Sequence, residues 1–184
     1  PDTMYASAYQ RRRHVWTLIN GGPESGIWKS TDGGETWREV STGLPTEDMG
    51  RIGLDISPVD PDVVYAIVEA ANDKSGFFRS TDRGETWERM SDHVSNSPQY
   101  YQEIVCHPTD VDTVYALDTF THFTEDGGRT WEILPRQNRH VDDHALWIDP
   151  DRPNHMIMGG DGGIYDSYDG GKTWRFMPNH PVTQ

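Results

Sequence analysis

The sequence predicts an all-β protein of about four repeated units, each made of four short antiparallel strands. A short motif, S/T-x-D-x-G-x-T-W, occurs four times, and its aspartates are 50, 44 and 43 residues apart. Runs in which apolar and polar residues alternate lie before and after each copy, as is typical of half-buried strands. No stretch has helical periodicity long enough to predict a helix. Four strands in about 45 residues is the organisation of a β-propeller blade.

The strands of each unit are expected in a fixed order. Those before and after the motif form the third and fourth strands, and Pro- and Asp-rich turns join the first strand to the second. Expected first strands are residues 51–57, 103–107 and 145–149, and second strands are 63–70, 113–118 and 155–159. Expected third strands are 26–30, 76–80 and 163–167, and fourth strands are 36–40, 86–90, 130–134 and 173–177.

Each copy of the motif is predicted to be the turn of a β-hairpin. An Asp side chain can accept hydrogen bonds from the backbone that follows it, and Gly tolerates a positive φ. The motif residues are Ser30, Asp32, Gly34, Thr36 and Trp37; Ser80, Asp82, Gly84, Thr86 and Trp87; Thr124, Asp126, Gly128, Thr130 and Trp131; and Ser167, Asp169, Gly171, Thr173 and Trp174. We expect structural roles for all of them, with the four Trp side chains packed between blades.

The chain is expected to form one propeller segment over residues 1–184, with blades at about 1–43 (partial), 44–93, 94–138 and 139–180. Residues 1–9 match the turn and second strand of the later units, so the first blade lacks a first strand. We therefore expect part of a larger propeller, whose flanks are covered by the remaining blades of the same polypeptide, a second copy or another protein. The alternatives are a four-bladed ring and two half-rings that form one propeller.

The four motifs resemble the Asp-box, or BNR, repeat. Families with this repeat include sialidases, xyloglucan-cleaving endoglucanases, the luminal domain of sortilin-type receptors and a photosystem II assembly factor. The resemblance covers essentially the whole chain and implies a β-propeller. It also implies that each Asp box joins the third and fourth strands on the face away from the active site. It implies no single activity, because these families share the repeat and not a function.

The charge of the chain argues against two classes of partner. The chain contains 16 Lys and Arg residues and 30 Asp and Glu residues, which gives a net charge of −14. Such a chain is a poor non-specific binder of polyanions, so we expect no nucleic-acid partner. No run of about 18 apolar residues is present, so we expect no membrane insertion. The single cysteine, Cys106, rules out an internal disulfide and is expected to be a buried, inert thiol.

Candidate ligand-binding residues lie in the connections opposite the Asp boxes. The second-to-third and fourth-to-first connections of a propeller share that face, and loops on a rigid scaffold commonly carry function. Arg11, Arg12 and Arg13, followed by Trp16, begin the longest connection, residues 10–25. Arg can clamp a carboxylate or phosphate, and Trp can stack on a sugar. The alternative is that these Arg side chains pair with neighbouring Asp and Glu.

The sequence HVDDH at residues 140–144 is a second candidate. His140 and His144, with Asp142 and Asp143 between them, can bind a divalent metal or act as acid and base. Their spacing fits no established zinc motif, so we expect no metal and no cofactor; the alternative is a hydrogen-bonded loop. Asp161, in the turn GGDGG, is a further carboxylate on this face. Candidate catalytic carboxylates are therefore Asp142, Asp143 and Asp161.

The sequence thus predicts an extracytoplasmic (secreted or periplasmic) propeller that acts as a protein- or glycan-binding or assembly module. The alternative is a glycoside hydrolase segment of the sialidase or xyloglucanase type, which uses carboxylates on the loop face. Neither an arginine triad nor a Tyr/Glu pair of the sialidase kind can be assigned. Arg51-Ile52-Gly53 also departs from the sialidase Arg-Ile-Pro signature at its third position, which favours binding over hydrolysis.

Overall fold

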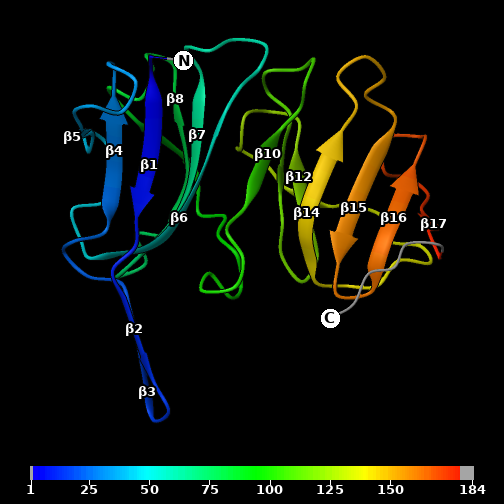
Figure 1. Ribbon diagram of the computed structural model, residues 1–184, viewed down its shortest axis with the longest axis horizontal. Coiled ribbons are helices and arrows are strands. Elements are labelled where there is room, and N and C mark those ends of the chain that lie inside the picture. Colours follow the sequence, from blue (N-terminus) through cyan, green and yellow to red (C-terminus); the bar gives the residue numbers. More distant parts are fainter. Residues whose placement is uncertain (1, 179–184) are drawn as a thin grey trace.

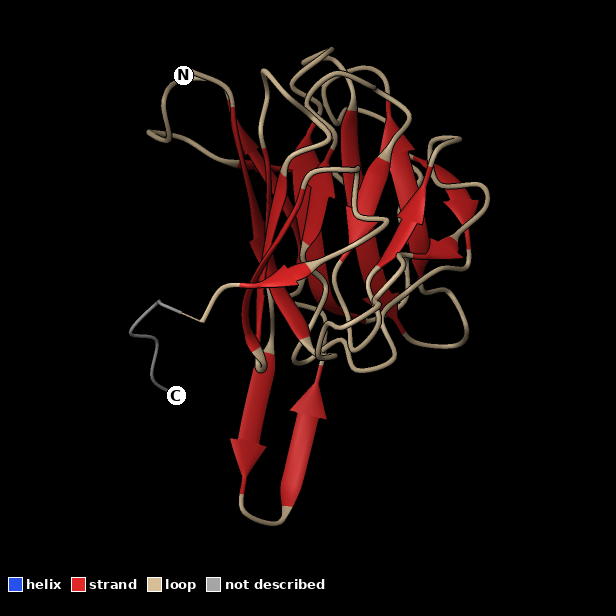
Figure 2. Ribbon diagram, turned by 90° about the vertical axis from the view of Figure 1, so that its right-hand side faces the viewer, coloured by secondary structure: helices blue, strands red, loops and turns tan. Residues whose placement is uncertain are grey.

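The computed structural model describes residues 2–178, and within them it contains strands and turns but no helix (Figure 2). It follows that this part of the chain has no helix that could cross a membrane. Apart from a two-stranded sheet of β2 and β3, four antiparallel sheets follow one another along the chain (Figure 1). The expected all-β fold built of four-stranded antiparallel sheets is confirmed.

Within each sheet the strands are hydrogen-bonded in sequence order, which is the arrangement of a propeller blade. The first sheet contains β1 (Met4–Ala8), β4 (Gly26–Ser30) and β5 (Arg38–Glu39). The second contains β6 (Met49–Ile56), β7 (Val64–Ala70), β8 (Gly76–Ser80) and β9 (Glu88–Ser91). The third contains β10 (Ile104–Cys106), β11 (Val114–Ala116), β12 (His122–Thr124) and β13 (Glu132–Ile133), and the fourth β14 (Asp143–Ile148), β15 (Met156–Gly160), β16 (Gly163–Ser167) and β17 (Arg175–Phe176).

The third strands β4, β8 and β16 span the predicted residues, whereas the fourth strands are shorter than predicted. The fourth strand of the first sheet was expected at residues 36–40, but β5 contains only Arg38–Glu39. Thr36 belongs to the turn instead, because its backbone N–H and its hydroxyl both donate hydrogen bonds to Asp32, at 2.9 and 2.5 Å. The hydrogen bonds of the motif's side chains therefore extend the turn two residues beyond the end predicted from the alternation of apolar and polar residues.

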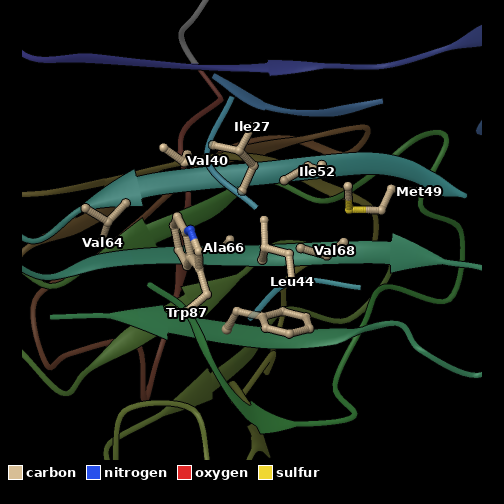
Figure 3. Packing of buried hydrophobic residues seen from close by; sticks show 10 residues of the cluster. Ile27, Val40, Leu44, Met49, Ile52, Val64, Ala66, Val68 and Trp87 are labelled. Carbon is tan, nitrogen blue, oxygen red and sulfur yellow. The ribbon is translucent and has the colours of Figure 1, made fainter. Parts of the chain in front are cut away.

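Apolar side chains fill the space between successive sheets. Strand β7 shows how, because Val64, Ala66 and Val68 face the first sheet while Tyr65 and Ile67 face the third. This alternation follows from the two-residue period of a strand, and it buries both faces of the second sheet. Figure 3 shows the cluster between the first and second sheets, where Trp87 lies beside Ala66.

The burial of the Asp-box tryptophans depends on the sheet that precedes each of them in the chain. Trp87 and Trp174 are buried against the first and third sheets, and Trp131 is half-buried against Phe77 of the second, with ring centroids 4.9 Å apart. Trp37 is 38% exposed. Within residues 2–178 no other sheet packs against Trp37, so the expectation that it lies between blades stays a prediction.

Residues 10–25 form a structured element and not an open loop. Strands β2 (Arg11–His14) and β3 (Thr17–Asn20) pair with each other and with no other strand of residues 2–178, and together they form a two-stranded ribbon. In Figures 1 and 2 this ribbon projects well beyond the ends of the sheets. It extends from the same end of the sheets as the turn between β15 and β16, and we call that end the loop face.

Candidate functional site

The carboxylates of the Asp boxes are occupied within their own turns. Asp32 receives hydrogen bonds from the Ser30 hydroxyl at 2.7 Å and from the backbone N–H and hydroxyl of Thr36. These bonds, those from Thr36 foremost, lower the pKa of Asp32 to about 2. The same contacts recur at Asp82, Asp126 and Asp169, whose pKa values are also lowered to about 2. This is the hydrogen bonding of a turn, at the end of the sheets opposite the loop face.

Four side chains meet on the loop face, three from connections and one from the start of β14. The Tyr101 hydroxyl donates to Asp142 Oδ1 at 2.8 Å, and His144 Nε2 lies 3.1 Å from Asp161 Oδ1. The Tyr101 and His144 rings stack, with centroids 5.3 Å apart and planes inclined by 10°. We call Tyr101, Asp142, His144 and Asp161 the loop-face cluster. It brings together three of the residues that the sequence singled out, and it adds Tyr101.

Backbone contacts fix the two carboxylates of the cluster. Asp142 has a φ of 67°, and its backbone N–H donates to the Thr119 carbonyl at 3.1 Å. Its carbonyl accepts a hydrogen bond from the Asp161 N–H, also at 3.1 Å. A Cβ on Gly160 would lie 2.3 Å from that carbonyl oxygen, so only glycine permits this approach. The glycines of the GGDGG turn therefore hold Asp161 beside the segment that carries Asp142.

Asp143 is not available to a ligand, which corrects the expectation from the sequence. The side chain is buried, its Oδ1 forms an ion pair with Arg139, and its Oδ2 accepts a hydrogen bond from the Thr121 hydroxyl at 2.6 Å. Arg139 is buried as well, and its guanidinium lies 4.9 Å from the Trp174 ring centroid. With both carboxylate oxygens engaged, Asp143 ties the third sheet to the fourth and cannot act as a catalytic carboxylate.

His140 does not join the cluster. Its Nδ1 lies 2.6 Å from the Val141 carbonyl, so the ring is turned to its own backbone. Among residues 2–178, no group of three or more His, Cys, Asp or Glu side chains is placed to hold a metal ion. The cluster offers hydrogen bonding by one imidazole, one phenol and two carboxylates.

The ribbon carries the remaining candidates on the loop face. Arg11, Arg12 and Arg13 are exposed on β2, and Trp16 is 82% exposed at the tip. No Asp or Glu within residues 2–178 forms an ion pair with any of the three Arg side chains, so the alternative of internal salt bridges is not seen. The Arg13 guanidinium lies 3.4 Å from the Tyr100 hydroxyl instead.

Sequence reasoning missed Tyr100 and Tyr101. A usable signal was present, because two consecutive aromatic residues directly follow a turn-rich segment, SNSPQ, in a fourth-to-first connection. Tyr100 is 51% exposed, whereas Tyr101 is buried beneath His144. The two neighbours therefore differ in role, with one ring available on the surface and the other supporting the cluster.

The family of the chain follows from its sequence. The model of the Sortilin-Vps10 family, described as sortilin, neurotensin receptor 3, matches residues 25–143, which is more than half of the chain. The chain belongs to the Sortilin-Vps10 family. No curated protein matches it by sequence. The resemblance to Asp-box propellers is thereby confirmed for a family that was among those expected.

Solved structures share the fold of this Sortilin-Vps10 chain at low sequence identity. An ancestral GH74 enzyme matches 84% of the chain with a TM-score of 0.60 and 16% identity, and the match covers 22% of that enzyme. The GH74 xyloglucanase from Xanthomonas campestris matches 95% of the chain and 36% of its own length, with a TM-score of 0.48 and 17% identity. YCF48 bound to D1 peptide matches 86% of the chain and 76% of its own length, with a TM-score of 0.47 and 14% identity. The chain thus spans about a fifth of the ancestral enzyme's length, and this likeness concerns the fold alone.

Proposed function

We propose that this chain is part of an extracytoplasmic propeller that serves as a binding or assembly module, with its protein or glycan ligand on the loop face. The observation that carries the proposal is the loop-face cluster, in which side chains from three connections and from the start of β14 meet. The side chains of His144 and Asp161 are 45% and 54% exposed, so a ligand can reach both. Sites of this kind combine a few fixed polar groups with aromatic surface.

The chemistry of the cluster suits a ligand with hydroxyl or amide groups. Carboxylate oxygens of Asp142 and Asp161 accept hydrogen bonds, and the His144 ring can donate or accept. Tyr100, the neighbour of Tyr101 in the chain, adds a half-exposed ring with an apolar face. Sugars and peptides both supply such donors beside apolar surface, which is why the proposal includes both.

A substitution in the cluster tests this proposal. Screening the purified protein on a glycan array and a peptide array identifies the ligand. His144→Ala should then weaken binding by about tenfold or more, equivalent to about 1.4 kcal/mol. The matched control is His107→Ala, which changes a half-buried histidine near a turn at the Asp-box end of the third sheet. Ligand binding that His144→Ala leaves unchanged would contradict the proposed site.

A second candidate function is glycoside hydrolysis, favoured by the presence of two carboxylates, Asp142 and Asp161, in one cluster. Glycosidases use such a pair as acid and as base or nucleophile. If the protein hydrolyses xyloglucan or a sialoside, Asp142→Asn and Asp161→Asn should each lower kcat by at least about a hundredfold. If the protein hydrolyses one of these substrates and both substitutions lower kcat in this way, the hydrolase function replaces the binding proposal. Hydrolysis that survives both substitutions would exclude this cluster as the active site.

We also propose that both flanks of the segment are covered in the working protein, by further blades of the same polypeptide, a second copy or another protein. Trp28 and Trp37 are 37% and 38% exposed on the first sheet, and Trp147 and Tyr168 are 48% and 61% exposed on the fourth. Clustered apolar side chains mark interaction surfaces.

The location outside the cytoplasm is tested by fractionating cells, since finding the protein only with cytoplasmic markers would contradict it.

A further inference from the structure

The β2–β3 ribbon exposes side chains that folded proteins usually cover. Val15 and Trp16 at the tip are 100% and 82% exposed, and Leu18 and Ile19 on β3 are 41% and 47% exposed. An isolated two-stranded ribbon is only marginally stable in water. Trp and Arg are also the side chains most enriched at the energetic centres of protein interfaces. These features indicate that the ribbon contacts a surface outside this copy of the chain.

The register of the ribbon defines the kind of surface it fits. Arg12 pairs across with Ile19, and Arg13 with Leu18, so one strand is cationic and the other apolar. Successive residues of a strand point to opposite faces, which places an Arg and an apolar side chain on each face. A flat partner would cover only one face, so the ribbon fits a recess that is apolar and acidic.

This chain has such a recess at the base of its own ribbon. A hollow of about 330 Å³ is lined by the acidic residues Glu39, Glu47 and Asp48 and by the apolar residues Pro45 and Met49, among others. Within residues 2–178, none of these three carboxylates takes part in an ion pair. Its size is at the lower end of the range for small-molecule pockets, about 300–1,000 Å³, so it admits an indole ring.

We propose that a second copy of this chain is the partner of the ribbon. The ribbons of two copies lie antiparallel, and the tip of each, with Trp16, Arg12 and Arg13, enters the acidic hollow of the other. Gly22 and Pro23, which follow β3 almost directly, also line the hollow, so the hollow lies at the base of the ribbon. In the antiparallel pair, the tip of each ribbon therefore lies at the base of the other. A twofold axis then produces two identical contacts that are complementary in charge. This inference uses a different surface from the loop-face cluster and does not depend on the proposed function.

Charge exchange tests the arrangement. The ribbon variant Arg12→Glu/Arg13→Glu and the hollow variant Glu47→Lys/Asp48→Lys should each weaken the dimer by about tenfold or more in sedimentation equilibrium. Mixing the two variants should restore it, because each negative ribbon then meets a positive hollow and each positive ribbon a negative one. The unmodified protein should sediment at twice its monomer mass, and about 1 M salt, where the Debye length is about 3 Å, should favour the monomer.

The controls separate this contact from other surfaces. Arg129→Glu, a charge change at the Asp-box end, should leave the dimer intact, and Trp16→Ala should weaken it without changing the circular dichroism spectrum. An unmodified protein that stays monomeric at high concentration, or variants whose mixture fails to associate, would overturn the proposal. So would a monomer that binds vesicles containing phosphatidylserine and loses this binding with Trp16→Ala, since the ribbon would then serve a lipid surface.

Discussion

At the scale of single residues, burial decides the chemistry of the histidines. The His93 ring stacks on Trp131, with centroids 4.0 Å apart and planes inclined by 13°, and the His122 ring lies 5.0 Å away. Burial, together with a smaller contribution from the neighbouring His122, lowers the pKa of His93 to about 4, while Asp92 opposes the change. His93 therefore stays neutral between the second and third sheets over a range in which an exposed histidine gains a proton.

This histidine predicts a loss of stability in mild acid. Because the folded-state pKa is below the ordinary value of 6.5, the contribution of His93 is complete above about pH 6.5 and is lost as the pH falls toward about 4. Urea unfolding between pH 7.5 and 4 should show a slope of up to about 1.4 kcal/mol per pH unit from this group. The variant His93→Phe keeps an aromatic ring but cannot titrate, so its slope should be smaller; an equal slope would contradict the assignment.

The two differently buried tryptophans provide a second prediction at this scale. Trp87→Ala removes a ring that is only 5% exposed and should cost about 3–5 kcal/mol of unfolding free energy. Trp37→Ala is the matched control, since the same motif position is 38% exposed there, and it should cost much less. Both are measured by urea unfolding. Equal losses would show that Trp37 is covered by a partner or that Trp87 lies outside the core.

At the scale of elements, the Asp box is a turn that builds itself from its own side chains. In the second sheet, the Ser80 hydroxyl accepts a hydrogen bond from the Gly84 N–H at 2.8 Å and donates one to Asp82 at 2.7 Å. Asp82 in turn receives two from Thr86. All of these contacts lie within seven residues, so the turn depends little on the rest of the fold, and four copies adopt it alike.

The ionised carboxylate of the box should matter in strong acid. Hydrogen bonds from Thr86 are the main cause that lowers the pKa of Asp82 to about 2. A depressed pKa means that the stabilisation is present above the ordinary value of about 3.8 and is lost as the pH falls toward 2. Asp82→Asn should therefore lower the Tm at pH 7 and flatten the acid transition between pH 4 and 2. An unchanged acid transition would show that Thr86 does not favour the ionised form.

At the scale of the whole molecule, the segment is held together where one sheet meets the next. Gly53, on β6, approaches the Gln102 backbone of the following connection so closely that a Cβ there would lie 1.6 Å from the carbonyl oxygen. Gln102 is buried, and its side chain reaches back to the Arg51 carbonyl at 3.3 Å and to the Ser95 N–H at 3.1 Å. This contact joins the second sheet to the segment that positions Tyr101.

Adding one methyl group at this junction should therefore affect both stability and the loop face. Gly53→Ala should destabilise the protein by at least about 1–3 kcal/mol, the usual cost of overpacking, because the obstacle is backbone. It should also weaken any ligand binding that depends on Tyr101. Gly159→Ala is the matched control, since the added Cβ would lie 3.8 Å from that of Ala145, an ordinary contact. A similar Tm for both variants would contradict the tight junction.

The sequence by itself determined the repeat, the strand order and the turns, because these depend on residues close together in the chain. Alternating apolar residues predict a strand wherever they occur, and the four Asp boxes satisfy their own hydrogen bonds. The third strands β4, β8 and β16 were therefore predicted to the residue, whereas β12 was not predicted. The bounds of the first and second strands differ from the prediction by up to two residues, and the β2–β3 ribbon was not predicted. The fourth strands are shorter than predicted because side chains such as Thr36 bond to the turn in place of the neighbouring strand.

Only the tertiary structure decided which of these residues are available to a ligand. Asp142 and Asp143 are adjacent, yet one meets Tyr101 on the loop face and the other is buried against Arg139. Trp37 and Trp87 occupy the same position of the same motif, yet within residues 2–178 only Trp87 packs against a preceding sheet. In each pair the local sequence is nearly equivalent, and the difference comes from neighbours contributed by distant parts of the chain, which no local pattern encodes.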